Sequence, residues 1–530
     1  MYERSNSKPS SGSHESVWLA TTPTTEYGRL DGGLDVDTAV IGGGIAGITT
    51  AAKLREAGQS VALLERDRIL TAVTGHTTAK LTSLHGMPYS HVEKHFGEDG
   101  ARLYAEANES AIDDIEETVD ESGIDCAFSR RPACTYVTEP DRVERVREEV
   151  SAANRAGLDA SFVTETELPV PVAGDIEVAD QASFHPRQYL LELARRIPGD
   201  GGHLLEETTV TDVDDGDPCE VETDRGTVHA TDVVVASHFP IVDEALYFSR
   251  LRPKRSYVIA VRLDGDQPEG MYYCPEEPYF SVRSYTHDGD RLVLFGGQNH
   301  RTGQGATTER YRDLEREVRK WFDVESVEYY WSTQDFVSPD RVPFIGPLAP
   351  QTDNLYVATG FGGWGMTGGT VAGMLLRDLI LGRDNEWADL FTPSRVKPRA
   401  SAGEFAAHNT HAVRHMVSDF LSRDPSFDAS SLSAGEADVF DVDGHSVGIY
   451  RDDAGDLHAV SATCTHMGCQ VTWNDAEHSW DCPCHGSRFD VDGSVLDTPA
   501  VEDLDQYTVR ERRLDDADRP DSSQERPEQR

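Results

Sequence analysis

The chain is poor in basic residues and has no long apolar run, and each shortage excludes a class of protein. Only seven of the 530 residues are lysine, and Lys and Arg together number 49 against 94 Asp and Glu, so the formal net charge is -45. Binding to nucleic acid needs a basic face, and no part of the chain offers one. No stretch of about 18 uninterrupted apolar residues exists, so we expect no transmembrane helix.

The first residues, 1–14, are polar and lack the apolar core of a signal peptide. We therefore expect a cytoplasmic protein. The acidic surplus has two explanations, a field that attracts a particular partner or solubility in concentrated salt, as in halophilic proteins. We favour the second explanation because the acidic residues are spread along the whole sequence. The length predicts two or three folding units.

Cysteine is also scarce, with eight in the chain, yet four of them lie between residues 464 and 484. Two clusters stand out there, Cys464-Thr-His466 and Cys482-Pro-Cys484-His485. One cysteine and one histidine from each of two loops form a mixed ligand set that fits a single iron–sulfur centre. Structural zinc is the alternative, but zinc fingers usually offer C-x2-4-C and H-x3-5-H pairs rather than one Cys and one His per loop.

The two clusters resemble the ligand loops of Rieske [2Fe-2S] proteins, with C-x-H, fifteen residues, and then C-x-x-H. The resemblance implies that Cys464 and Cys482 are the thiolate ligands and that His466 and His485 are the imidazole ligands. Such a centre has a higher reduction potential than a cluster held by four cysteines. The task expected of this part of the chain is one-electron transfer.

The same resemblance implies roles for neighbouring residues. Rieske proteins of the cytochrome bc type carry a disulfide where this chain has Cys469 and Cys484; free thiols are the alternative, because a cytosolic chain usually keeps its cysteines reduced. High-potential relatives have a serine and a tyrosine whose hydroxyls bond to the cluster sulfur and to a ligand sulfur, and here the residues are Ser487 and Phe489. Because hydrogen bonds to sulfur stabilise the reduced cluster, the missing hydroxyl predicts a potential below that of a centre with both.

A glycine-rich turn near the N-terminus predicts a dinucleotide site. Residues 37–41 read as a buried strand, an apolar-periodic helix follows to about residue 57, and a second strand covers residues 61–64. The residues that would contact the dinucleotide are Gly42, Gly44, Gly47 and Glu65. In this motif the glycines permit a tight turn, the approach of a pyrophosphate and close packing of helix on sheet, while the acid bonds to the ribose. An ordinary glycine-rich turn is the alternative, disfavoured by the acid at the right distance.

Later segments resemble FAD-dependent oxidoreductases of the D-amino-acid oxidase and sarcosine oxidase family, over most of residues 36–382. Residues 340–367 resemble the segment that closes over the flavin ring in that family, and residues 74–80 resemble its loop at the flavin edge. The resemblance implies FAD as the cofactor, with contacts from Thr77, Thr78, Val210, Gly362, Gly363, Trp364, Gly365 and Met366. Covalent attachment through His76 or His85 stays open. No second dinucleotide motif is present, which disfavours NAD(P)H as the donor.

Two stretches, at about residues 87–185 and 250–332, resemble the substrate domain of the same family. Residues 87–157 read as helical and acidic. The second stretch has alternating strands that predict a sheet forming one wall of a pocket over the flavin. We expect Arg283 to anchor the substrate, because an arginine fork grips a carboxylate with two hydrogen bonds. A surface arginine at a strand end is the alternative.

The predicted fold is therefore α/β (α+β), with a FAD-binding Rossmann-type domain, a mixed-sheet substrate domain and a small all-β Rieske domain at the C-terminus. The expected parts are a partly disordered segment at 1–33, the oxidoreductase domain at 34–395, a linker with a helix at 396–432, the Rieske domain at 433–514 and a disordered tail at 515–530.

Two redox centres in one chain predict a dehydrogenase that oxidises an amine or amino acid at FAD and passes the electrons singly to the cluster. An external ferredoxin, cytochrome or quinone would then accept them. A plain oxidase of the family returns its electrons to O2 and needs no cluster. The main alternative is an electron-transfer or redox-sensing protein without small-molecule turnover. A reductase for a ring-hydroxylating oxygenase is disfavoured because no NAD site is found, and the substrate class rests on resemblance alone.

Overall fold

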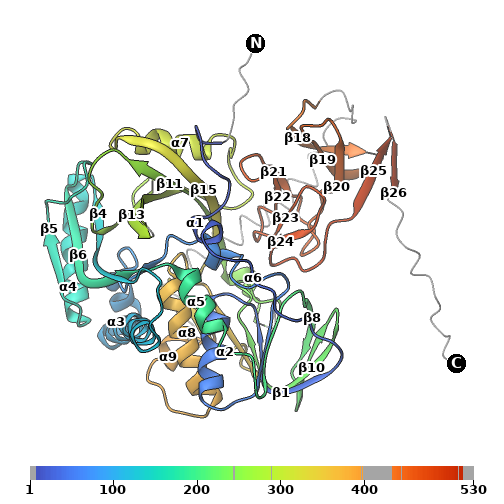
Figure 1. The fold of residues 1–530 in the computed structure, drawn as a ribbon, viewed down its shortest axis with the longest axis horizontal. Helices are drawn as coiled ribbons and strands as arrows, with labels where there is room; N and C mark the ends of the chain where they lie inside the picture. Colours follow the sequence, from blue (N-terminus) through green and yellow to red (C-terminus); the bar gives the residue numbers. More distant parts are fainter. Residues whose placement is uncertain are drawn as a thin grey trace. The chain divides into compact units, whose positions relative to one another are not determined.

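The computed structural model (Figure 1) describes residues 8–242, 245–277, 279–287, 289–395, 397, 432–442, 444–510 and 513–516. The chain divides into two compact units, which we describe separately: Met1–Arg301 with Glu309–His408 form unit 1, and Thr302–Thr308 with Asn409–Arg530 form unit 2. The helix expected in the linker, and the tail after residue 516, lie outside the described residues.

The first sheet of unit 1 has the parallel core that the glycine motif predicts. Its order is β16-β17-β10-β1-β2-β7, with β9 joined to β10 and β8 to β9. The strands are β1 Leu34–Ile41, β2 Val61–Leu64, β7 Gly202–Leu205, β8 Val210–Asp214, β9 Cys219–Thr223, β10 Gly226–Val235, β16 Phe344–Pro347 and β17 Leu355–Thr359. All four residues of β2 are buried, which is typical of a parallel strand covered on both faces.

Helix α2 (Ile45–Glu56) starts directly after the glycine turn, so the predicted order of strand, turn, helix and strand is confirmed. Gly42 has a φ of +111°, and a Cβ at this position would lie 2.6 Å from the carbonyl oxygen of Ala236. A Cβ on Gly47 would lie 1.9 Å from the carbonyl oxygen of Gly42. Only glycine fits these two positions, because the backbone itself occupies the space of a side chain.

The second sheet of unit 1 is mixed, with the order β15-β11-β14-β13-β12-β4-β6-β3 and β5 joined to β6. Its strands are β3 Lys80–Leu81, β4 Ser129–Val137, β5 Ala160–Val163, β6 Gly174–Ser183, β11 Arg252–Leu263, β12 Met271–Cys274, β13 Phe280–His287, β14 Asp290–His300 and β15 Val324–Val337. This is the mixed sheet expected for the substrate domain.

The prediction that residues 87–157 are helical is wrong in its middle. Helices α3 (Tyr89–Ser122) and α4 (Val143–Arg155) are present, but strand β4 lies between them. β4 pairs with β6 on one side and with β12 on the other, and its last five residues are buried. Packing inside a sheet therefore decides the structure of this segment, against the helical reading of the run around it.

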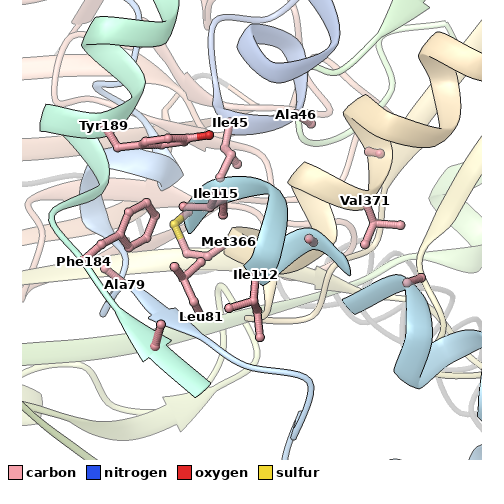
Figure 2. Close-up of a cluster of buried hydrophobic side chains, with 14 of the residues drawn as sticks. Ile45, Ala46, Ala79, Leu81, Ile112, Ile115, Phe184, Tyr189, Met366 and Val371 are labelled. Atoms are coloured by element: carbon pink, nitrogen blue, oxygen red, sulfur yellow. The ribbon is translucent and has the colours of Figure 1, made fainter. Parts of the chain in front are cut away.

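One apolar core lies where α2, α3, β3 and α8 (Gly365–Ile380) meet. Figure 2 shows its labelled members, which are Ile45, Ala46, Ala79, Leu81, Ile112, Ile115, Phe184, Tyr189, Met366 and Val371. The remaining helices of unit 1 are α1 Val17–Ala20, η1 Val73–His76, η2 Pro140–Arg142, α5 Pro186–Ala194, α6 Tyr247–Arg250, α7 Arg310–Val318 and α9 Ala388–Phe391. Val17 and Trp18 are buried in this core, so the disorder expected for residues 1–33 does not extend to α1.

Unit 2 contains two antiparallel sheets, as expected for a small all-β domain. Their orders are β18-β19-β20-β25-β26 and β21-β22-β23-β24. The strands are β18 Ala437–Val442, β19 His445–Arg451, β20 Leu457–Ser461, β21 Thr472–Asn474, β22 Ser479–Asp481, β23 Arg488–Phe489, β24 Val495–Asp497, β25 Gln506–Arg510 and β26 Arg513–Asp516. Within the described part of the chain, no helix combines the length and apolar character needed to cross a bilayer.

Candidate cofactor sites

Three segments that the sequence assigns to FAD meet at the first turn of α2. Thr74 Oγ1, from the predicted flavin-edge loop, accepts the N–H of Ile45 at 3.1 Å. Helix α8, which follows Gly362 and Gly363, packs so closely on α2 that a Cβ on Gly369 would lie 2.7 Å from Ile45 Cγ2. The first turn of the described helix α2 carries no acidic side chain. The positive end of its dipole favours an anion such as a pyrophosphate at this turn.

Glu65 lies at the carboxyl end of β2, beside the glycine turn. Its carboxylate accepts the N–H groups of Gly43 at 2.7 Å and Asp67 at 3.0 Å. Burial raises the pKa of this carboxyl group. The N–H of Thr208 donates to the Glu65 carbonyl at 3.0 Å, which brings the chain leading to Val210 to the same edge of the sheet. The contacts of Glu65 and Val210 with the adenosine half of FAD remain what the resemblance implies.

An aromatic group surrounds Trp364 at the start of α8. Its ring stacks on His85, with centres 5.0 Å apart, and meets Tyr273 edge-on at 5.4 Å. The two ring nitrogens of His85 lie 2.6 Å from the Tyr104 hydroxyl and 3.0 Å from Thr367 Oγ1. Burial lowers the pKa of His85 to about 3, so its imidazole is neutral near pH 7. A covalent bond from His85 to flavin would have to break one of these two contacts.

Three titratable side chains that the sequence analysis did not select form a group around Asp335, which contacts Gly363. Asp335 on β15 accepts the N–H of Gly363, and its register partner on β11 is Lys254. His238, just after β10, is close enough to Asp335 to lower its pKa by charge, although burial has the larger effect and raises that pKa. Burial likewise lowers the pKa of Lys254, whose Nζ lies 5.2 Å from the ring centre of Tyr279. This polar group adjoins the segment expected to contact flavin.

Arg283 does not have the surroundings expected of a substrate anchor. Its side chain is 1% exposed, and its guanidinium donates to the main-chain carbonyls of Ala79 and Phe184. The guanidinium carbon lies 5.3 Å from the centre of the Trp18 ring. We correct the prediction accordingly: Arg283 joins the flavin-edge loop to the second sheet, and both its terminal nitrogens are used in doing so.

Lys80 is buried at the end of the flavin-edge loop. Its Nζ donates to the Tyr272 carbonyl at 2.7 Å and to the hydroxyl of Ser281. Burial, followed by the positive charge of Arg283, lowers the pKa of Lys80 to about 7. The folded protein therefore releases this proton at a much lower pH than the unfolded chain does.

We expect Lys80→Met to change how stability depends on pH. The unfolded chain holds the Lys80 proton up to about pH 10.5, whereas the folded chain loses it above about pH 7. Wild-type stability should thus gain up to about 1.4 kcal/mol per pH unit across this window, relative to the variant. Urea unfolding of FAD-loaded protein at pH 7 and pH 9 measures the difference, with the exposed Lys320→Met as the control. If the free energy of unfolding differed between wild type and Lys80→Met by the same amount at both pH values, the assignment would be contradicted.

The four predicted iron ligands come together from two loops of unit 2. The Sγ atoms of Cys464 and Cys482 are within hydrogen-bonding distance of one another. The ring centres of His466 and His485 are 5.1 Å apart, with the rings perpendicular. Cys464, Cys482 and His485 are buried and His466 is partly buried. A pair of sulfur donors and a pair of imidazoles, each pair formed across the same two loops, fit a [2Fe-2S] cluster with this ligand set.

Neighbouring residues hold these ligand loops. The sulfur atoms of Cys469, on the first loop, and Cys484, on the second, lie 2.08 Å apart. Ser487 donates its hydroxyl to Cys464 Sγ and accepts the N–H of Ala500 at 3.0 Å. Phe489 is fully buried in β23 and offers no donor. The structure therefore shows the Ser487 hydroxyl on a ligand sulfur and no hydroxyl at position 489, while the bond from Ser487 to a cluster sulfur stays a prediction.

Phe489→Tyr should raise the midpoint potential of the cluster. One added hydrogen bond to a ligand sulfur is worth roughly 0.5–1.5 kcal/mol, which corresponds to about 20–60 mV for one electron. A redox titration followed by EPR measures the shift, and Phe440→Tyr, on β18 in the same unit, is the matched control. A midpoint that stays unchanged or falls in Phe489→Tyr would refute the role given to this position.

Comparison with known proteins agrees with this geometry. Residues 37–379 match the family model described as FAD dependent oxidoreductase, and residues 424–508 match the model of the Rieske [2Fe-2S] domain. YhfW of Bacillus subtilis (strain 168), which is named as a Rieske 2Fe-2S iron-sulfur protein, is 39% identical over 500 residues, covering 93% of this chain and 98% of that protein.

Two further matches concern the first part of the chain. Gamma-glutamylputrescine oxidoreductase of Escherichia coli (strain K12) is 27% identical over 400 residues, covering 71% of this chain and 91% of that protein. The crystal structure of glycine oxidase from Geobacillus kaustophilus has a TM-score of 0.57 at 18% identity, covering 68% of this chain and 100% of that one. The second match is a likeness of fold alone.

Proposed function

Because the chain belongs to the FAD dependent oxidoreductase family and ends in a Rieske [2Fe-2S] domain, we propose that it is an amine or amino-acid dehydrogenase with a built-in electron outlet. Its cofactors are FAD and a [2Fe-2S] cluster. In the proposed reaction FAD takes two electrons from the substrate, and the cluster passes them on one at a time to an external ferredoxin, cytochrome or quinone.

The observation that carries this proposal is the pair of thiols and the pair of imidazoles that the same two loops bring together, in the same chain as the FAD-binding unit. An enzyme that returned its electrons to O2 at the flavin would have no use for such a centre. The similarity to gamma-glutamylputrescine oxidoreductase supports an amine as the electron donor. The alternative, a redox carrier without small-molecule turnover, is decided by the experiment below.

We place the polar end of the substrate at Lys254 and Asp335. Both are partly buried, they are partners in the pairing of β11 with β15, and their charges are opposite. Asp335 also accepts the N–H of Gly363. An ammonium group fits the Asp335 carboxylate, and a substrate carboxylate, where there is one, fits the Lys254 ammonium. The two side chains together would receive an amino acid as a zwitterion, whereas a plain amine would use Asp335 alone.

An anaerobic screen of amines and amino acids tests the proposal. Each compound is mixed with FAD-loaded protein in the absence of O2, and the flavin absorbance is followed. The proposal expects bleaching by an amine or amino acid, followed by reduction of the cluster in the same chain. Bleaching only by a reduced protein partner, with no response to any small molecule, would favour the carrier instead.

We also propose that Cys469 and Cys484 form a disulfide in the isolated protein, as the geometry between the ligand loops suggests. Protein that is unfolded without reductant and then alkylated should leave these two residues unmodified, while Cys126 and Cys134 are labelled. Peptide mass spectrometry makes the count. Labelling of both Cys469 and Cys484 would show that they do not form a disulfide.

A further inference from the structure

Unit 2 includes a short segment, Thr302–Thr308, that the sequence analysis assigned to another domain. Segment Thr302–Thr308 lies between β14 and α7, which are both elements of unit 1, yet it belongs to unit 2. The sequence analysis placed it inside the substrate-domain stretch 250–332. The iron–sulfur unit therefore includes seven residues that come more than a hundred positions before the rest of it.

Gly303 of this segment lies directly against the backbone of the second ligand loop. A Cβ on Gly303 would stand 2.5 Å from the Pro483 nitrogen and 2.8 Å from the Cys482 carbonyl carbon. Contacts this short with main-chain atoms cannot be relieved by turning a side chain. Gly303 also has a φ of +69°, which favours glycine. Any larger residue must therefore move the segment or the ligand loop.

Hydrogen bonds hold the segment on both sides of this contact. Thr472 Oγ1 on β21 donates to the Gly303 carbonyl at 3.2 Å, and the N–H of Asp475 donates to Thr307 Oγ1 at 3.1 Å. Gln304 Nε2 lies 3.4 Å from the Pro483 carbonyl and donates to it. β21 pairs with β22, and β22 leads straight into Cys482. The segment is thus bonded both to the ligand loop and to the strands that precede it.

We infer that Thr302–Thr308 is a positioning segment for the iron–sulfur centre: it fixes the backbone of the loop that carries Cys482 and His485. The inference rests on the proposed ligand set. Groups that contact the metal ligands, without binding the metal themselves, affect the affinity for the metal and the reduction potential of the centre. A C-terminal fragment that starts near residue 400 would therefore lack Thr302–Thr308, which contacts its second ligand loop.

The test compares Gly303→Ala with Gly455→Ala in the full chain, each loaded with FAD and iron. Gly455 lies in unit 2 between β19 and β20 with a φ of +96°, and among the described residues nothing lies within 4 Å of a Cβ there. It therefore reproduces the backbone strain without the contact. We expect Gly303→Ala to bind less iron per chain and to show shifted EPR g values after dithionite, and Gly455→Ala to match the wild type in both.

A second variant tests the inference even if Gly303→Ala fails to fold. Thr307→Val removes only the acceptor for the Asp475 N–H, so a folded protein with a shifted cluster midpoint is expected; the FAD absorbance of unit 1 should be unchanged. Wild-type iron content, g values and midpoint in both variants would overturn the inference alone. Wild-type protein without any Rieske EPR signal would overturn the ligand set, and this inference with it.

Discussion

Asp335→Asn should lower kcat/KM for the amine or amino acid that bleaches the flavin by about 10- to 100-fold. A hydrogen bond to a charged group contributes roughly 1.5–3 kcal/mol, and each 1.4 kcal/mol is a factor of ten. The asparagine oxygen can still accept the N–H of Gly363, so the change removes the charge and keeps the support of the flavin segment. FAD content, measured by absorbance after unfolding, should therefore stay at the wild-type level.

Matched variants separate recognition of the substrate from general damage. Lys254→Met should weaken amino acids far more than plain amines, because only the former carry a carboxylate. Asp232→Asn, on β10, is the control: Asp232 is also partly buried, and burial raises its pKa to about 6. Anaerobic stopped-flow bleaching measures all three variants. Equal losses in Asp335→Asn and Asp232→Asn, or no loss in either, would remove Asp335 from the substrate site.

Cys482→Ser should abolish electron flow to a one-electron acceptor while leaving substrate oxidation intact. Loss of one of two thiolates from this ligand set removes the cluster, since a serine hydroxyl is a poor ligand for iron in such centres. The substrate should still bleach the flavin of the variant without O2. Reduction of added cytochrome c should fall to the rate seen without substrate.

The control for this experiment is Cys126→Ser, which replaces a buried free cysteine of unit 1. It should keep wild-type iron content and wild-type cytochrome c reduction. If Cys482→Ser still reduced cytochrome c at the wild-type rate, electrons would be leaving the flavin without the cluster. The proposed transfer of electrons from FAD through the cluster would then be wrong, although oxidation of the substrate by FAD would remain supported.

The sequence predicts best those features whose chemistry lies within a few neighbouring residues. Gly42 and Gly47 are set by close backbone contacts in one turn, and the structure shows both contacts. The pairs Cys464 with His466 and Cys482 with His485 each lie within four residues, so spacing alone suggested the site. The strand at Val61–Leu64 was predicted with its observed bounds because it follows the glycine motif at a fixed distance.

Features that depend on strand register or on distant segments were beyond such reasoning. Lys254 and Asp335 are 81 positions apart and meet only because β11 pairs with β15. The available signal was a charged residue within each of two otherwise strand-like stretches. Arg283 was predicted to bind a carboxylate because of the shape of its guanidinium. The sequence could not show that this group donates to the carbonyls of Ala79 and Phe184, because both lie far from Arg283 along the chain. Gly303 carried no local signal of its contact with Pro483.

The most direct test of the central claim is EPR spectroscopy of protein reduced by its own organic substrate, without O2 and without dithionite. The account predicts an anisotropic [2Fe-2S] signal that appears after the flavin bleaches, in protein that contains iron. Bleached flavin with no such signal, or zinc in place of iron, would show that electrons do not pass from FAD to a Rieske cluster in this chain.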